Sequence, residues 1–155
     1  MKKKIYIGAG IIFILDLISK IVISNTLTLG KEYYIIPKFF YLYLSKNTGA
    51  AWSILSNSSY ILAIISVVAL IFLHKEIKED MNKLYMVAFI LIIGGILGNL
   101  FDRVFYGYVI DFIGFNIFGY YFPIFNVADI CITLGAILII ICLIKGDRNE
   151  VRSSK

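Results

Sequence analysis

The chain has 155 residues and a formal net charge of +5; 60% of its residues are hydrophobic, only 16% are charged, and its mean hydropathy is +0.88. An ordinary soluble domain is about 45–50% apolar and about 25% charged, so this composition argues against a soluble protein and for a surface that faces lipid. The length suits a single domain over residues 1–155, and the hydrophobic residues come in blocks, as membrane spans do.

The first apolar block, residues 5–23, predicts a membrane-spanning helix, because a span needs about 20 mostly apolar residues. Lys2–Lys4 and the apolar run after them also fit the first two parts of a cleaved signal peptide. No small-residue cleavage site follows, and Asp16 and Lys20 continue the helical pattern, so a retained span is favoured. Asp16 and Lys20 are spaced i, i+4 with the acid first, which suits an ion pair on a helix. A structural pair and a direct catalytic role are both open for them.

The segment 24–57 has a mixed composition and contains two runs typical of β-strands. Glu32–Ile36 and Phe39–Leu44 are rich in β-branched and aromatic residues. We expect a small sheet that rests on the membrane surface. Asn47 follows these runs, and the small residues after it, Gly49 among them, permit close approach of the backbone to another group.

Residues 58–73 and 84–102 form the second and third predicted spans, which a short charged connection joins. The third span ends in Asn99, Asp102 and Arg103, spaced i, i+3, i+4, so one helical face presents all three. Hydrogen bonding between helices, contact with lipid headgroups and a role in a site are all open for them.

The segment 103–125 leads into the fourth predicted span, residues 126–144, and contains Asp111 between two apolar neighbours. Asn126 can cap the fourth helix, but a cap does not account for Asp129 one turn further in. A carboxylate next to hydrocarbon is rare and marks function by default. Two that meet suggest acid/base chemistry by an aspartate pair, so we favour a functional role for Asp111 and Asp129.

Basic residues are divided unequally between the two sides of the predicted spans. Ten lie on the side of the termini (Lys2, Lys3, Lys4, Lys75, Lys78, Lys83, Lys145, Arg148, Arg152 and Lys155) and four on the other (Lys31, Lys38, Lys46 and Arg103). By the positive-inside rule both termini are cytoplasmic. The basic charge is then an orientation signal and an attraction to anionic membrane lipids, and nucleic-acid binding is a poor explanation for it.

In this orientation the polar residues of the spans and of both outer segments converge on the outer rim of the bilayer. Because they come from separate stretches of the chain, we expect one shared site. Two carboxylates close together cannot easily both ionise, so such a pair holds one proton between them.

Five motifs in order resemble those of bacterial lipoprotein signal peptidase, also called signal peptidase II. They are Asp16-Leu17-Ile18-Ser19-Lys20, Asn47-Thr48-Gly49-Ala50-Ala51-Trp52-Ser53, Gly98-Asn99-Leu100-Phe101-Asp102-Arg103, Val109-Ile110-Asp111-Phe112 and Phe122-Pro123-Ile124-Phe125-Asn126-Val127-Ala128-Asp129. The order, the spacing and the four-span layout match over nearly the whole chain. One departure is Ile130, where the family usually has a small hydroxyl residue, and it concerns a local hydrogen bond rather than the class.

The resemblance implies an intramembrane aspartyl endopeptidase that removes the signal peptide of diacylglyceryl-modified prolipoproteins, cutting before the modified cysteine. It implies that Asp111 and Asp129 are the catalytic pair. The residues that it implies for substrate binding or support are Asp16, Lys20, Asn47, Gly49, Asn99, Asp102, Arg103 and Asn126. It also implies inhibition by globomycin-type cyclic peptides and the absence of a metal or cofactor.

The expected fold is therefore an all-α membrane protein with four transmembrane helices and a small extracytoplasmic β-sheet. The resemblance adds a short, mobile extracytoplasmic helical segment within Phe105–Tyr121. The expected location is the bacterial cytoplasmic membrane, with the active site at its outer face.

Two other interpretations stay open at this point. Asp102, Asp111 and Asp129 could hold Mg²⁺ or another hard cation in a metal-dependent hydrolase, because such ions prefer oxygen ligands. The polar rim could instead line the entrance of a four-span transporter or scaffold. Transporters more often place ionisable groups near the midplane of the membrane, which counts against that interpretation.

Overall fold

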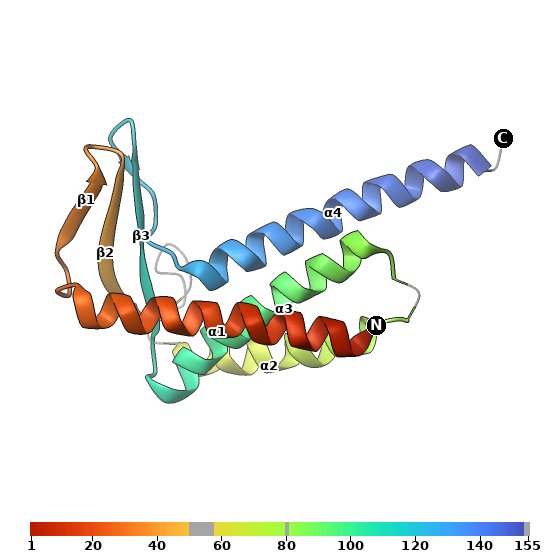
Figure 1. The fold of residues 1–155 in the computed structure, drawn as a ribbon, viewed down its shortest axis with the longest axis horizontal. Coiled ribbons are helices and arrows are strands. Elements are labelled where there is room, and N and C mark those ends of the chain that lie inside the picture. Colours follow the sequence, from red (N-terminus) through yellow and green to blue (C-terminus); the bar gives the residue numbers. More distant parts are fainter. Residues whose placement is uncertain (50–57, 80, 154–155) are drawn as a thin grey trace.

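A computed structural model describes residues 1–49, 58–79 and 81–153, with side chains up to residue 144. In these ranges the elements are α1 (Lys2–Thr26), β1 (Glu32–Ile36), β2 (Phe40–Asn47), α2 (Ser59–Glu76), α3 (Lys83–Phe105), β3 (Val109–Ile117), β4 (Tyr120–Tyr121) and α4 (Val127–Ser153). The helices form a bundle, and the sheet lies at one end of it, with strands that run across the helix axes (Figure 1).

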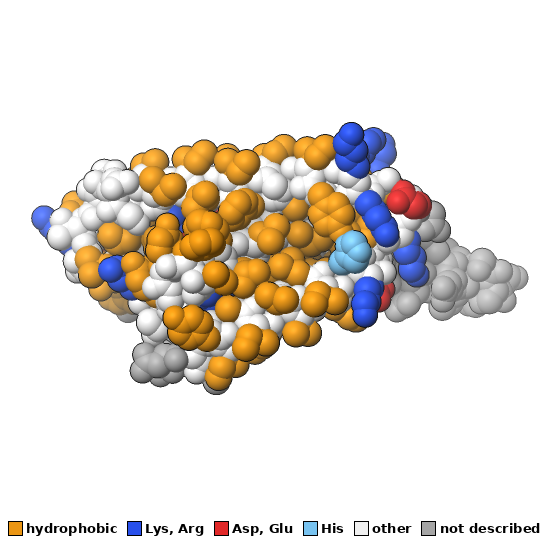
Figure 2. All heavy atoms as spheres, turned by 90° about the horizontal axis from the view of Figure 1, so that it is seen from below, with side chains coloured by type: hydrophobic (Ala, Val, Ile, Leu, Met, Phe, Trp, Pro, Cys, Tyr) orange, Lys and Arg blue, Asp and Glu red, His pale blue; other side chains and the backbone are white. Residues whose placement is uncertain are grey.

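Each helix contains a segment that is long and apolar enough to cross a membrane, so a helix covers each of the four predicted spans. The helices end three to nine residues beyond the predicted limits, and α2 and α4 begin one residue later than predicted. Isoleucine and phenylalanine side chains on α2 remain exposed, among them Ile64 at 65% and Phe72 at 63%, because little of α2 is covered by the rest of the protein. Figure 2 shows hydrophobic side chains over the middle of one face, with most Lys and Arg side chains at the end away from the sheet. This distribution is what a lipid-facing surface requires.

The helix α3 lies at the centre of the bundle and contacts the other three helices. Close approach depends on its glycines: a Cβ at Gly95 would lie 2.5 Å from the carbonyl oxygen of Ala128 on α4. Small residues at helix contacts are the common device in membranes, where packing rather than the hydrophobic effect holds helices together. The close packing brings α1, α3 and the start of α4 together at the sheet end.

The sheet is antiparallel with strand order β1-β2-β3-β4. The strands β1 and β2 confirm the sheet expected in segment 24–57. The central pairing joins β2 to β3 and places Asp111 opposite Ser45, next to an irregularity between Leu42 and Ser45. The sheet therefore holds Asp111 on a hydrogen-bonded strand.

The helical segment expected within Phe105–Tyr121 is wrong, because most of that stretch forms β3 and β4. Val109–Ile117 is rich in β-branched and aromatic residues, and β2 offers it a free edge for backbone hydrogen bonds. Phe115 of β3 stacks on Phe40 of β2 with ring centroids 5.2 Å apart. Pairing with a distant strand decides the structure of this stretch.

Candidate active site

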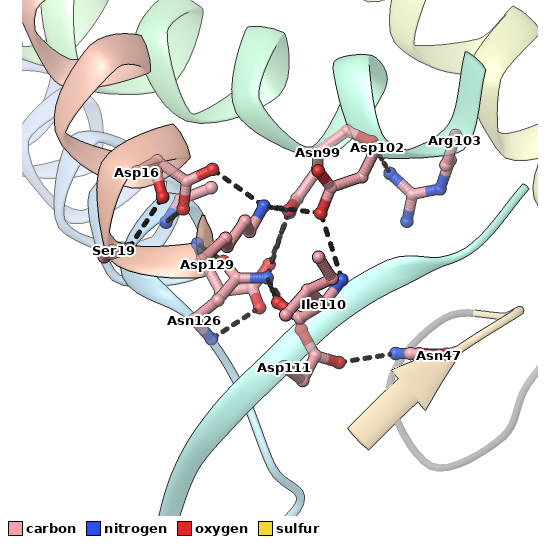
Figure 3. Close-up of polar contacts among 12 residues, drawn as sticks. Asp16, Ser19, Asn47, Asn99, Asp102, Arg103, Ile110, Asp111, Asn126 and Asp129 are labelled. Atoms are coloured by element: carbon pink, nitrogen blue, oxygen red, sulfur yellow. Dashed lines mark hydrogen bonds and ion pairs between the residues drawn. The ribbon is translucent and has the colours of Figure 1, made fainter. Parts of the chain in front are cut away.

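The residues singled out from the sequence meet where the bundle joins the sheet (Figure 3). Asp16 and Lys20 lie on α1, Asn47 ends β2, Asn99, Asp102 and Arg103 lie in the last turns of α3, Asp111 lies on β3, and Asn126 and Asp129 lie at the start of α4. Together with Gly49, all of them belong to one connected network of hydrogen bonds and ion pairs. The predicted convergence is thus present in the structure.

Asn126 connects the two aspartates and is completely buried. Its side-chain Nδ2 donates to Asp111 Oδ1 at 2.7 Å. Its Oδ1 accepts from the backbone N–H of Asp129 at 2.9 Å, and its own N–H donates to Asp129 Oδ2 at 3.2 Å. This reciprocal arrangement is a capping box, with Asp in the place of the usual Glu. The predicted cap is confirmed, and the same residue also bridges the two carboxyl groups.

Two further asparagines hold the aspartates from the other sides. Asn99 Nδ2 donates to Asp129 Oδ1 at 2.7 Å, and Asn47 Nδ2 donates to Asp111 Oδ2 at 2.9 Å. The oxygen of each amide is occupied elsewhere, by Lys20 for Asn99 at 3.0 Å and by the N–H of Gly49 for Asn47 at 2.9 Å. Because each oxygen already faces a donor, each amide nitrogen faces a carboxylate.

Lys20 lies beneath this pair, fully buried, and its ammonium group contacts two carboxylates. It is 2.7 Å from Asp16 Oδ2 and 3.0 Å from Asp102 Oδ2. The predicted i, i+4 pair is therefore present, with Asp102 as an additional partner. With Asn99 as the third acceptor, all three ammonium protons are used.

Asp16 and Asp102 each hold the backbone of the residue that precedes a candidate catalytic aspartate. Asp102 Oδ2 accepts from the N–H of Ile110 at 3.0 Å, and Asp16 Oδ1 accepts from the N–H of Ala128 at 2.9 Å. Lys20 thereby fixes β3 and the start of α4 relative to each other through two carboxylates. Sequence reasoning missed both backbone contacts, because every residue other than proline has a backbone N–H and its contacts do not depend on the residue type. The apolar neighbours of Asp111 were the one available sign of a buried strand.

Arg103 is half-buried at the end of α3. One guanidinium nitrogen donates to the carbonyl oxygen of Asn99 at 3.4 Å, while its Nε is buried without a hydrogen-bond partner among the described residues. A buried donor of this kind has capacity for a further acceptor.

Burial raises the pKa of Asp111 to about 7, and the negative charge of Asp129 adds to this effect. Hydrogen bonds from Asn47 and Asn126 act in the opposite direction. Since the Asp111 carboxyl is only 3% exposed, loss of hydration is the dominant cause. A carboxyl group with this pKa holds a proton at neutral pH about as often as it lacks one.

The ligand set proposed for a cation does not form in the part of the chain that the structure describes. No three His, Cys, Asp or Glu side chains within it are placed to hold a metal ion. Asp102 faces Lys20 and the N–H of Ile110 instead of joining Asp111 and Asp129.

Comparison with known proteins gives consistent matches over nearly the whole chain. The family model described as signal peptidase (SPase) II matches residues 8–145. Proteins named lipoprotein signal peptidase from Staphylococcus aureus strains MRSA252 and JH9 are each 43% identical over 159 residues, covering 97% of this chain and 96% of their own length.

Two solved structures share the fold. One, described as "Bacterial membrane enzyme structure by the in meso method at 2.3 A resolution", has a TM-score of 0.87 at 42% identity and covers 95% of this chain and 91% of its own. The other, described in the same words at 1.9 A, has a TM-score of 0.82 at 42% identity, with coverages of 92% and 94%. The chain is thus similar to bacterial membrane enzymes in sequence and in fold.

Proposed function

This chain belongs to the signal peptidase II family and is a multi-pass membrane peptidase, and from this premise we propose that it is an aspartyl endopeptidase acting on lipid-modified prolipoproteins. It cuts before the diacylglyceryl-modified cysteine and so releases the signal peptide. The observation that carries the aspartyl mechanism is the bridge from Asn126 to both Asp111 and Asp129. A shared buried partner keeps the two carboxyl groups together at the junction of bundle and sheet.

In the proposed reaction the pair carries one proton, as two neighbouring carboxyl groups do. Asp111, with its raised pKa, holds that proton, and ionised Asp129 takes a proton from a water molecule. The water oxygen attacks the scissile carbonyl carbon while Asp111 donates to the carbonyl oxygen. Asp129 then gives its proton to the leaving nitrogen as the carbon–nitrogen bond breaks. One hydroxyl group of the gem-diol intermediate returns its proton to Asp111, which leaves a carboxyl product and restores the singly protonated pair.

The supporting residues supply fixed dipoles and charge around this centre. Asn47 and Asn99 orient the two carboxyl groups through their amide nitrogens. Arg103, with an unused buried donor, is placed to stabilise negative charge on the substrate carbonyl. Residues 1–155 act as one membrane domain in this proposal, with both termini in the cytoplasm and the site at the outer face of the bacterial cytoplasmic membrane. Globomycin-type cyclic peptides are expected to compete with the substrate.

The first prediction tests the catalytic pair. Asp111→Asn and Asp129→Asn should each lower cleavage of a diacylated prolipoprotein by at least about 10²–10⁴-fold, because Asn keeps the shape but relays no proton. The double variant should be hardly worse than either single one, since the two groups act as a unit. The measurement is loss of the signal segment by mass spectrometry, with purified protein in lipid nanodiscs.

The matched control is Glu79→Gln, which removes an exposed carboxylate that pairs with the amino terminus at the other end of the bundle. It should leave cleavage unchanged. Addition of a chelator to the wild type should also leave cleavage unchanged. Substantial cleavage by a folded Asn variant, or activity lost on chelation and restored by a divalent cation, would overturn the aspartyl mechanism.

A further inference from the structure

The connection between β3 and β4 is a two-residue hairpin loop made of Phe118 and Gly119, with Ile117 paired to Tyr120 on either side. Both loop residues have positive φ, 51° for Phe118 and 89° for Gly119. A tight hairpin of this kind favours Asn-Gly, because Asn and Gly adopt positive φ readily and a bulky residue does not. Asn116 Oδ1 accepts from the N–H of Gly119 at 2.9 Å and stabilises the turn around the unfavourable residue.

Phe118 is also the most exposed hydrophobic side chain of the protein's described part, at 105% of its reference area. An aromatic residue here is unfavourable for the backbone and gains no contact within the chain. Since no contact within the chain explains an exposed phenylalanine with positive φ at this position, we look for a partner outside the chain.

The residues around Phe118 are also hydrophobic or aromatic and exposed. Ile117, Tyr120, Tyr121 and Phe122 are all exposed, by 39% to 57%. Residues 112–125 contain no charged side chain at all. A loop that faced only water would not combine full exposure with this composition, whereas aromatic residues are enriched at the boundary of membrane and water.

A second exposed turn lies beside the Phe118 hairpin. The turn between β1 and β2 carries the exposed side chains of Ile36 and Phe39, and Phe39 packs on Phe115 with ring centroids 5.4 Å apart. The carbonyl oxygen of Phe39 accepts from the N–H of Asn116, so the two turns are joined. Lys38 in this turn supplies a positive charge, which suits the phosphate groups of lipid headgroups.

The β3–β4 hairpin lies at a level of the bundle that suits contact with lipid. In Figure 1 the β3–β4 hairpin projects to the side of the bundle, and α1 extends further along the bundle axis than the hairpin does. The last turns of α1 carry exposed apolar residues, including Ile18 at 52% and Val22 at 54%, which face lipid. Along the bundle axis the hairpin thus ends short of the end of α1, whose last turns still carry exposed apolar side chains.

We propose that the Phe118 hairpin inserts into the lipid leaflet next to the sheet and anchors β3 to the membrane surface. Asp111 lies on the same strand, about 23 Å from the tip at about 3.3 Å per residue, too far for the tip to contact the scissile bond. The strand therefore holds a catalytic carboxyl group toward one end and a membrane anchor at the other. The anchor fixes the tilt of the sheet relative to the bilayer.

The test measures depth directly and requires no catalytic activity. A nitroxide is attached at Phe118→Cys in vesicles of phosphatidylethanolamine and phosphatidylglycerol, and its collisions with oxygen and with a water-soluble nickel chelate are compared. Val22→Cys is the lipid-exposed reference, and Glu32→Cys on the outermost strand is the aqueous reference. Unaltered protein, in which Cys131 and Cys142 are buried, controls for background labelling.

The nitroxide at position 118 should favour oxygen over the nickel chelate, as at position 22 and unlike position 32. A second experiment places the label at Tyr120→Cys and adds Phe118→Asn, which suits the turn and so preserves the hairpin. This substitution should raise nickel accessibility at position 120.

Nickel accessibility at position 118 equal to that at position 32 would overturn the proposal, and so would an unchanged label at position 120 in the Asn variant. Spin–spin broadening at position 118 that disappears on dilution with unlabelled protein would assign the tip to a second copy of the chain, which also excludes a lipid anchor.

Discussion

At the scale of single residues, the site depends on amide side chains with one correct orientation. Asn47, Asn99 and Asn126 each use the oxygen for one set of donors and the nitrogen for a carboxyl group. An amide whose oxygen is fixed can donate to a carboxyl group without competing for its proton. The single proton proposed for the pair would then lie inside a ring of donors that do not titrate.

The second prediction concerns pH and Asp111. With a pKa of about 7 for this carboxyl group, kcat/KM should fall on the alkaline side of about pH 7, because the pair then loses its shared proton. Asn47→Ala removes a hydrogen bond that lowers this pKa, so the alkaline limb should move to higher pH. The measurement is the pH profile of prolipoprotein cleavage. A limb that stays in place or moves down in Asn47→Ala contradicts this assignment.

The same raised pKa has a consequence for stability. Because the pKa is higher in the folded chain than its ordinary value of 3.8, the protonated carboxyl contributes stability that is fully present below about pH 4 and is lost as the pH rises through about 7. The thermal midpoint should therefore fall more steeply over this range in the wild type than in Asp111→Asn.

The third prediction concerns Lys20. Lys20→Met leaves Asp16 and Asp102 buried without their cation, which should lower stability by about 3–5 kcal/mol. Adding Asp16→Asn should recover only part of this loss, since Asp102 remains charged, and adding Asp102→Asn as well should recover most of it. Thermal unfolding in detergent measures the relative stabilities of these variants. Wild-type stability in Lys20→Met alone would show that the three groups do not depend on one another.

At the scale of elements, the site requires α1, α3 and α4 to approach so closely that a side chain does not fit between them. Gly98 of α3 faces the Asp16 carboxylate of α1 and the methyl group of Ala128 on α4. The close contact between the helices thus lies directly against the buried ion network. Loss of close packing would displace the carboxylate that holds the start of α4.

The fourth prediction follows from this contact. Gly98→Ala should lower stability by about 1–3 kcal/mol, because its Cβ would fall on Asp16 Oδ2. Cleavage should fall as well, since Asp16 would lose its position against Ala128. Gly10→Ala on α1 is the matched control: apart from the local backbone of α1 and the two chain neighbours, no atom lies within 4 Å of its Cβ, so stability should stay the same or rise slightly. Equal effects of the two substitutions would refute the packing argument.

The comparison of sequence and structure is clearest at this scale. The four spans follow from blocks of apolar residues, and the polar residues that converge are those whose charge conflicts with their surroundings. The strand β3 was not predicted, although Val109–Ile117 is rich in β-branched and aromatic residues, because its partner β2 lies more than sixty positions away and the sequence does not show which segments pair. The role of Asp102 as the second partner of Lys20 depends on the contact between α1 and α3, which residue spacing within one helix does not reveal.

At the scale of the whole molecule, the charges and the site lie at opposite ends. Lys and Arg side chains gather mostly at the end away from the sheet (Figure 2). The candidate active site lies where the bundle joins the sheet (Figure 3). By the positive-inside rule the basic end is expected in the cytoplasm, which in the proposed function places the site at the outer face, on the side of a translocated prolipoprotein.

The fifth prediction tests this orientation at the two ends of α2. Single cysteines at Ser58→Cys, before the helix, and at Lys75→Cys, in its last turn, should react from opposite sides. In a background that lacks Cys131 and Cys142, an impermeant reagent added to intact cells should label position 58 and leave position 75 unlabelled. Labelling of position 75 alone would invert the topology.

The ion network also connects the first and the last helix of the chain. Asp16 on the first helix binds the N–H of Ala128 at the start of the last, a separation of 112 residues. A chain that is still on the ribosome with three helices inserted has no Asp129 and leaves the buried carboxylate of Asp16 without this partner. In the proposed function, which requires Asp129, a chain interrupted before its last helix would not cleave its substrate, and the order of membrane insertion would delay activity until the last helix is in place.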